Sequence, residues 1–206
     1  ERTGVDVHDE TARNILVGGG ATADGIRIRI PEYMVTRALS TAPERITLYD
    51  RNKNVAMRAW GHRTYFGGGS DCLNILDHRT GKRREPTLKD VVNATRVMDA
   101  LAEIDFVMSV GIPRDVPGER YYRHQFATML RHTTKPIVVV CDTRADMEAI
   151  AAMAATVAGG MDRLAQQPNI LLYSEPITPL QHPLEATEKL LFCAEHSIPI
   201  THSPAP

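Results

Sequence analysis

The chain has 206 residues, of which 43% are hydrophobic and 24% are charged, and its formal net charge is −1. These values are typical of a globular domain, and the near-neutral charge excludes the long-range field that attracts nucleic acids or anionic lipids. The sequence has no run of about 18 apolar residues, so we expect no membrane-spanning helix. Because neither a Met nor a signal peptide opens the chain, we expect it to start inside a longer protein.

Cysteine and histidine usage gives no sign of a redox or metal site. Cys72, Cys141 and Cys193 form no CxxC pair, which favours a reducing, cytoplasmic compartment, and each is expected to be a small buried hydrophobe. The eight histidines show no HxH or HExxH spacing. We therefore predict no bound metal.

Residues 1–60 are predicted to form a mixed α/β cap. Asp9 is placed to cap a helix that the glycines at 18–20 end, and residues 26–30 alternate like a half-buried strand. Pro31 suits the first turn of a second helix. Three further strands are predicted, at residues 45–49, 55–60 and 63–66.

Residues 61–86 are predicted to contain a hairpin. The strand that ends at Gly67 is expected to pair with residues 72–76, and a tight turn follows at 77–81. The basic residues at 82–84 then lie beside that turn. They indicate a solvated hairpin tip, and the alternative is a docking site for an acidic partner.

From residue 87 the sequence alternates regularly between helices and strands. Thr87 and Asp90 have the spacing of a capping box, and Thr143 or Asp142 is placed to cap a later helix. Strands are predicted to begin at residues 104, 136, 170 and 198, about 30 residues apart, as parallel strands with helical crossovers require. An open doubly wound sheet and a closed barrel both fit this pattern.

In either fold, ligands bind at the carboxyl ends of the parallel strands. Among the segments there, Gly67, Gly68, Gly69 and Ser70 can cradle an anion with their N–H groups, or they can form a strand-to-turn transition with unusual dihedral angles. No GxGxxG fingerprint is present, so nucleotide binding is not favoured.

Four other residues at these strand ends are candidates for binding a substrate. Glu175 can pair with a cationic ammonium group or cap a turn, and Asp142 can face a ligand or cap the following helix. Tyr173 can offer an aromatic face to a quaternary amine, although it can also point into the helix layer. His202 can face the mouth of a barrel, or it can be a satisfied structural histidine. No catalytic dyad or triad is apparent.

Short motifs along nearly the whole chain resemble the trimethylamine:corrinoid methyltransferase family, which also includes glycine betaine methyltransferases. The motifs, in chain order, are Ile30-Pro31-Glu32, Thr41-Ala42-Pro43-Glu44-Arg45, Phe66-Gly67-Gly68-Gly69, Leu76-Asp77, Thr80-Gly81-Lys82-Arg83-Arg84, Ala100-Leu101, Ile104-Asp105-Phe106-Val107, Asp115-Val116-Pro117, Thr134-Lys135-Pro136, Val157-Ala158-Gly159-Gly160, and Ser174 to Pro179-Leu180.

The resemblance implies a (β/α)₈ TIM barrel, of which residues 61–206 supply about the first half. It also implies transfer of a methyl group from trimethylamine or a quaternary amine such as glycine betaine to the cobalt of a corrinoid. In this family the cobalamin is carried by a partner corrinoid protein, so the chain itself is expected to bind no cofactor directly. Members that use trimethylamine carry a pyrrolysine in the later half of the barrel, beyond Pro206. The identity of the amine therefore stays open, and a homo-oligomer is compatible with the resemblance.

Two other functions remain open from the sequence. One is a non-catalytic half-barrel remnant or assembly partner, because a half barrel exposes edge strands that must be covered. The other is an open-sheet α/β enzyme that acts on a different small molecule.

Overall fold

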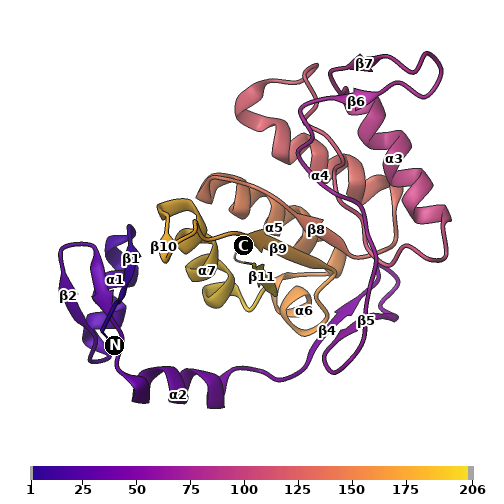
Figure 1. Cartoon of the computed structure of the whole chain (residues 1–206). Coiled ribbons are helices and arrows are strands. Elements are labelled where there is room, and N and C mark those ends of the chain that lie inside the picture. Colours follow the sequence, from indigo (N-terminus) through magenta and orange to yellow (C-terminus); the bar gives the residue numbers. More distant parts are fainter. Residues whose placement is uncertain (1, 204–206) are drawn as a thin grey trace.

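The computed structural model describes residues 2–203 and shows a mixed α/β protein with several separate sheets (Figure 1). These residues form a three-stranded parallel sheet with helices on it, a four-stranded sheet at the N-terminal end, and two antiparallel hairpins. The described residues form no closed barrel, so the expected half barrel is not confirmed by this architecture.

The central sheet consists of β8 (Ile137–Val139), β9 (Ile170–Ser174) and β11 (Ile200–His202), all parallel and in the order β11-β9-β8. Isolated parallel bridges extend the array beyond β8. Val107 bridges to Ile137, while Gly67 and Cys72 bridge to Phe106 and Gly111. Five parallel segments therefore lie side by side in the order in which they occur in the chain.

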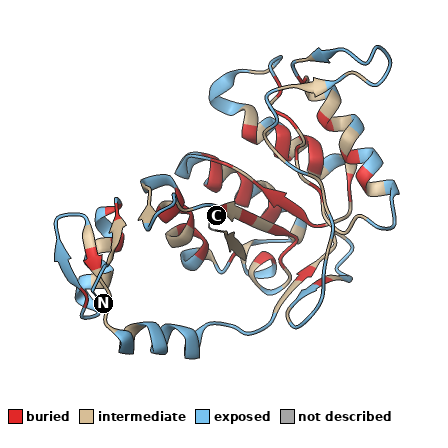
Figure 2. Ribbon diagram, viewed as in Figure 1, coloured by how far each residue is buried: buried red, intermediate tan, exposed pale blue. Residues whose placement is uncertain are grey.

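The apolar residues of β8 lie within the main hydrophobic core. Ile137, Val138 and Val139 are all buried, as the continuous apolar run predicts for a strand covered on both faces. The covering helices are α3 (Leu88–Ala100), α4 (Tyr121–His132), α5 (Arg144–Ala158), α6 (Met161–Gln166) and α7 (Leu184–His196). Figure 2 shows that buried residues concentrate in the central strands and in α4 and α5.

Several predicted helix ends are confirmed. Thr87 and Asp90 form a capping box at the start of α3, and Gly159 ends α5 in the left-handed conformation with φ of 96°. At the start of α5 it is Thr143, not Asp142, that caps the helix, because its hydroxyl accepts a hydrogen bond from the Asp146 backbone N–H at 3.2 Å.

The cap at Thr143 leads to a prediction on stability. Substitution T143A removes this acceptor and is expected to lower the free energy of unfolding by about 1 kcal/mol. Thr156 lies exposed on the same helix, and its hydroxyl bonds only to the Ala152 carbonyl, so T156A is a matched control with no expected loss. Urea denaturation of both variants checks the difference. Equal stabilities for the two would contradict the assigned cap.

The N-terminal part forms a sheet that includes a strand from much later in the chain. Its order is β10 (Gln181–His182), β1 (Val5–Val7), β3 (Arg27–Arg29) and β2 (Thr22–Asp24). Helix α1 (Glu10–Gly18) packs on this sheet, and the Asp9 carboxylate accepts from the Ala12 N–H at 2.6 Å, as predicted. The parallel pairing of β1 with β10 attaches this region to the chain just before α7.

Helix α2 (Glu32–Thr41) connects the N-terminal sheet to the hairpin formed by β4 (Ile46–Tyr49) and β5 (Val55–Ala59) (Figure 1). Helix α2 has no buried residue, and Figure 2 shows it exposed along its length. The predicted strand at 63–66 is not formed, and only a bridge at Gly67 follows.

The predicted pairing within residues 61–86 is wrong. Cys72 bridges in parallel to Gly111, and the hairpin instead joins β6 (Ile75–Leu76) to β7 (Arg83–Arg84). In this hairpin Arg84 is not a free basic residue, because it pairs with Asp77 at 3.0 Å and with Asp90 at 2.8 Å. Of the basic cluster, only Lys82 and Arg83 are exposed.

The short 3₁₀ helix η1 (Gly118–Arg120) completes the set of elements. Within residues 2–203, no helix is both long and apolar enough to cross a membrane.

Candidate functional site

The parallel register brings several of the predicted site residues to one edge of the central array. Ser174 pairs with His202 at the ends of β9 and β11. Val139 pairs with Leu172, so Cys141 and Asp142 follow at the same edge. Cys72 bridges to Gly111, which places Asp71 there as well. The carboxyl ends of the five segments therefore share an edge that carries Asp71, Asp142, Glu175 and His202.

The glycines at 67 and 68 lie further back along their segment and have a packing role. A Cβ atom on Gly67 would lie 2.2 Å from the Phe106 ring, and one on Gly68 would lie 2.6 Å from the Met98 sulfur of α3. Neither has a positive φ, so the alternative of a turn with unusual dihedral angles is not found. Gly69 and Ser70 continue toward the edge, and a Cβ on Gly69 would contact nothing.

Asp71 is the residue at this edge that the sequence analysis did not single out. Its φ is +56°, a conformation that a non-glycine residue rarely adopts, and the adjacent Val110 has φ of +67°. The Asp71 Oδ1 atom is buried and has no hydrogen-bond partner. Strained residues and unsatisfied polar atoms of this kind are concentrated at functional sites.

The pKa of Asp71 reflects these surroundings. Burial raises it from 3.8 to about 6, the negative charge of Asp142 adds to the increase, and the positive charge of Lys189 partly opposes it. Asp71 and Asp142 therefore lie close enough to repel each other. A cation placed between them would relieve the repulsion and stabilise both carboxylates.

Asp142 is exposed and accepts a hydrogen bond from Tyr122, one of two packed tyrosines. The Tyr122 hydroxyl donates to Asp142 Oδ2 at 3.0 Å, and the ring of Tyr121 lies 4.0 Å from that of Tyr122, centroid to centroid. Burial raises the pKa of Tyr122 far above its usual value, so this hydroxyl remains a donor. Because Thr143 caps α5, the Asp142 carboxylate is not used as a helix cap. Apart from the bond from Tyr122, it can therefore face a ligand at this edge.

Tyr173 and Glu175 lie at the end of β9. Tyr173 points away from the helix layer, because it lines a cavity of about 400 Å³ with Val138 and Leu171, beneath the β4–β5 hairpin. Burial, and then the charge of Glu175, raise the pKa of Tyr173. Glu175 itself is exposed. Both are therefore compatible with a cationic ligand, with the carboxylate nearer the solvent.

His202 is part of a short hydrogen-bond chain that runs through Ser174 to the Ala186 carbonyl of α7. Its Nδ1 lies 3.2 Å from Ser174 Oγ, which in turn donates to the Ala186 carbonyl at 3.2 Å. The Ser174 oxygen must therefore accept from a protonated Nδ1, which leaves the buried and unpartnered Nε2 as an acceptor. Burial, and then the charge of His182, whose ring lies 5.5 Å away, lower the pKa of His202 and favour this neutral form.

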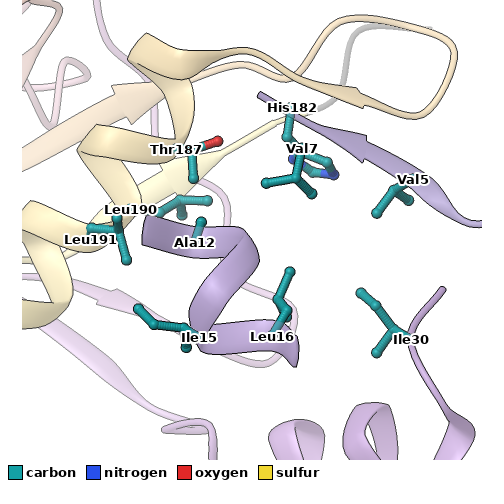
Figure 3. A pocket seen from close by; sticks show the side chains of 10 residues that line it. All are labelled: Val5, Val7, Ala12, Ile15, Leu16, Ile30, His182, Thr187, Leu190 and Leu191. Carbon is teal, nitrogen blue, oxygen red and sulfur yellow. The ribbon is translucent and has the colours of Figure 1, made fainter. Parts of the chain in front are cut away.

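A second cavity, of about 280 Å³, lies between the N-terminal sheet and α7. Figure 3 shows Ile15 and Leu16 of α1 opposite Leu190 and Leu191 of α7, with His182 above them. Its lining is apolar apart from His182 and Thr187, and it includes no carboxylate. It therefore lacks the charge that would hold a cationic ligand.

The two buried cysteines do not supply a nucleophile to this edge. Burial raises the pKa of Cys141 and of Cys193 to about 12, so both thiols are protonated at neutral pH. Cys72 is exposed, contrary to the prediction that every cysteine is buried. Within the part of the chain that the structure describes, no three His, Cys, Asp or Glu side chains are grouped to hold a metal ion.

The pKa of Asp71 predicts a pH-dependent stability. Because the pKa in the folded state lies above 3.8, ionisation opposes folding, with no cost below about pH 4 and the full cost above pH 6. The shift corresponds to about 3 kcal/mol before solvent screening, which we expect to reduce it to about 1 kcal/mol. D71N should therefore raise the free energy of unfolding at pH 8 but not at pH 4. Urea titrations at both pH values measure this, and an equal effect at both would contradict it.

Comparisons with known proteins identify the family to which the chain belongs. The family model described as trimethylamine methyltransferase (MTTB) matches residues 1–206. The chain is 30% identical over 202 residues to the trimethylamine methyltransferase MttB of Desulfitobacterium hafniense (strain DSM 10664 / DCB-2), covering 97% of this chain and 41% of that protein. The protein of the same name from Methanosarcina barkeri (strain Fusaro / DSM 804) is 26% identical over 96% of this chain and 41% of its own length.

A glycine betaine methyltransferase from Desulfitobacterium hafniense (strain Y51) is also similar, at 23% identity over 95% of this chain and 41% of its own length. The chain thus spans about two fifths of the length of these relatives. Because the family model matches every residue, the chain belongs to the trimethylamine methyltransferase family.

Proposed function

We propose that the complete protein transfers a methyl group from a methylated amine to the cobalt of a corrinoid carried by a partner protein, and that this chain supplies the first half of its (β/α)₈ barrel. The observation that carries the functional part is the buried, unpartnered carboxylate oxygen of Asp71 beside Asp142, at the carboxyl ends of parallel strands. Membership of the family supports the choice of substrate class.

The order of the parallel segments supports a barrel over an open sheet. In a doubly wound sheet the strand order reverses at a switch point, and the ligand binds there. In this chain all five segments neighbour each other in sequence order, from 67–72 through 106–111 to β8, β9 and β11, with no reversal. A singly wound array of this kind continues naturally into a closed barrel.

The residues of this edge are suited to holding a cationic methyl donor. The two carboxylates provide negative charge, and the rings of Tyr121, Tyr122 and Tyr173 can line a site for methyl groups. The reduced corrinoid would supply the nucleophile for the methyl carbon, while the electron pair of the C–N bond stays on the nitrogen of the departing amine. The contribution of this chain is then to bind and orient the donor.

The proposal is tested by incubating the complete protein with cob(I)alamin and either trimethylamine or glycine betaine, and following the loss of the cob(I)alamin absorbance. We expect loss that requires both the protein and the amine, with a reaction lacking the amine as the control for oxidation. Absence of transfer from any methylated amine would reject the proposal.

A further inference from the structure

The β6–β7 hairpin carries a group of exposed cations. Residues 78–83 include Arg79, Lys82 and Arg83 but no carboxylate, although the chain as a whole has a net charge of −1. All three residues are exposed, and no carboxylate within residues 2–203 forms an ion pair with any of them. Arg84 differs from them, because the protein itself supplies both of its acidic partners.

Hydrogen bonds fix the hairpin in place, so the cations do not lie on a loose loop. At the turn, Asp77 Oδ1 accepts from the backbone N–H groups of Arg79 and Thr80, both at 3.0 Å. At the base, Arg84 donates to Asp77 and to Asp90 in the first turn of α3. A two-stranded hairpin is only marginally stable by itself, and these bonds attach it to the start of α3 (Figure 1).

The hairpin lies at the edge that holds the candidate site. It begins shortly after Cys72, which bridges to Gly111 at the carboxyl ends of two parallel segments. The base of the hairpin packs on the loop after the second of these segments, because the Arg114 N–H donates to the Pro86 carbonyl at 3.0 Å. A protein that brings a methyl acceptor to the carboxylates of this edge must therefore approach the hairpin.

The outer face of the hairpin combines cations with exposed apolar surface. Leu76 and Arg83 lie directly opposite each other in the antiparallel pairing, so their side chains share one face. Leu76 is 73% exposed, and Leu73, just before β6, is 58% exposed. Apolar surface bordered by polar groups is typical of a protein–protein interface, whereas a hairpin tip that contacts only water gains nothing from exposed leucines.

We infer that the β6–β7 hairpin docks the protein that carries the corrinoid, and that this partner presents an acidic surface to Arg79, Lys82 and Arg83. The inference rests on the proposed function and specifies the surface through which its partner binds. Opposite charges across an interface accelerate association and set its orientation. A nucleic acid or an anionic membrane fits less well, because the chain as a whole carries no net positive charge.

The test measures binding of the complete protein to the corrinoid-binding protein of the same cells, purified by the absorbance of its cobalamin. Surface plasmon resonance gives the rate constants and the Kd. The variant K82E/R83E reverses two charges and leaves the bonds of Arg84 intact. It should weaken binding at least about 10-fold, mainly through slower association. The variant L76A keeps the charges and should instead raise the dissociation rate.

The β4–β5 hairpin provides a matched control. It also carries two exposed cations, Lys53 and Arg58, but its backbone bonds to Thr134 and Pro168, which precede β8 and β9. It therefore lies at the amino ends of these strands. K53E/R58E changes the net charge by the same amount as K82E/R83E, and we expect it to leave binding unchanged.

Equal binding by K82E/R83E and by the unmodified protein would overturn the inference, and so would a lack of binding by the unmodified protein. Methyl transfer to free cob(I)alamin should be the same for both proteins, because no docking is needed. A similar loss with free cob(I)alamin, in a variant whose thermal unfolding is unchanged, would mean that the cations contact the corrinoid itself and would also overturn the inference.

The two proposals fail in different ways. Methyl transfer to free cob(I)alamin, together with partner binding that K82E/R83E does not alter, would remove the role of the hairpin and leave the methyltransferase function standing. Binding that depends on Lys82 and Arg83, without transfer from any methylated amine, would do the opposite.

Discussion

Substitution D71N is expected to lower kcat/KM for methyl transfer about 100-fold, which is the largest functional effect that the structure predicts. Asp71 presents a buried oxygen that no protein group satisfies, and a cationic donor would pair with it. Loss of one charge from a buried charge pair commonly costs 2–5 kcal/mol, and asparagine keeps the shape of the side chain while removing that charge. Steady-state rates with the complete protein measure the change.

The same substitution should alter the pH profile. The carboxylate must be ionised to hold a cation, so kcat/KM of the unmodified protein should rise as the pH passes through about 6, the pKa of Asp71. D71N should lack this acidic limb. Asp24 carries an exposed carboxylate on β2, so D24N changes the net charge equally and is expected to have no effect. A D71N protein with unchanged rate and pH profile would remove Asp71 from the site.

Substitution F126A is expected to have the largest effect on stability, a loss of about 3–5 kcal/mol in the free energy of unfolding. Phe126 has no exposed surface and lies in α4, which packs on β8 between α3 and α5. Removing the ring would leave a cavity that helices on a parallel sheet cannot readily close. F126L retains most of the volume and is expected to cost less than about 1.5 kcal/mol.

Chemical denaturation of the two Phe126 variants measures these costs. Leu replaces more of the volume of the ring than Ala does. A smaller loss in the free energy of unfolding for F126L than for F126A would therefore show that packing, and not a general intolerance of substitution, determines the cost. A loss below 1 kcal/mol for F126A would mean that α4 does not cover the sheet as described.

Local features of the fold were predictable because neighbours in sequence determine them. The caps at Asp9, Thr87 and Thr143 depend on a side chain and an N–H group three residues away. The buried strand at 137–139 follows from its uninterrupted apolar run, and the left-handed end of α5 follows from Gly159. Each of these contacts is decided within a few residues.

Features that depend on distant contacts were not predictable. The bridge from Cys72 to Gly111 replaced the expected hairpin, and close packing against Phe106 and Met98 explains Gly67 and Gly68. Each of these contacts joins residues at least 30 positions apart. The preference of a short segment for a local or a distant partner cannot be decided from its composition.

The same limit applies to the candidate site. The strand-end rule predicts that Asp142, Glu175 and His202 share one edge, and the parallel register places them there. The special status of Asp71 comes from its left-handed backbone and its buried oxygen, both of which arise from neighbouring segments.

The most direct test of the account is a structure of the complete protein with a bound methylated ammonium ligand. We predict that the ligand nitrogen lies against the carboxylates of Asp71 and Asp142, at the carboxyl ends of β8, β9 and β11. A ligand bound at the opposite ends of these strands, or an Asp71 carboxylate fully paired with other protein groups, would contradict it.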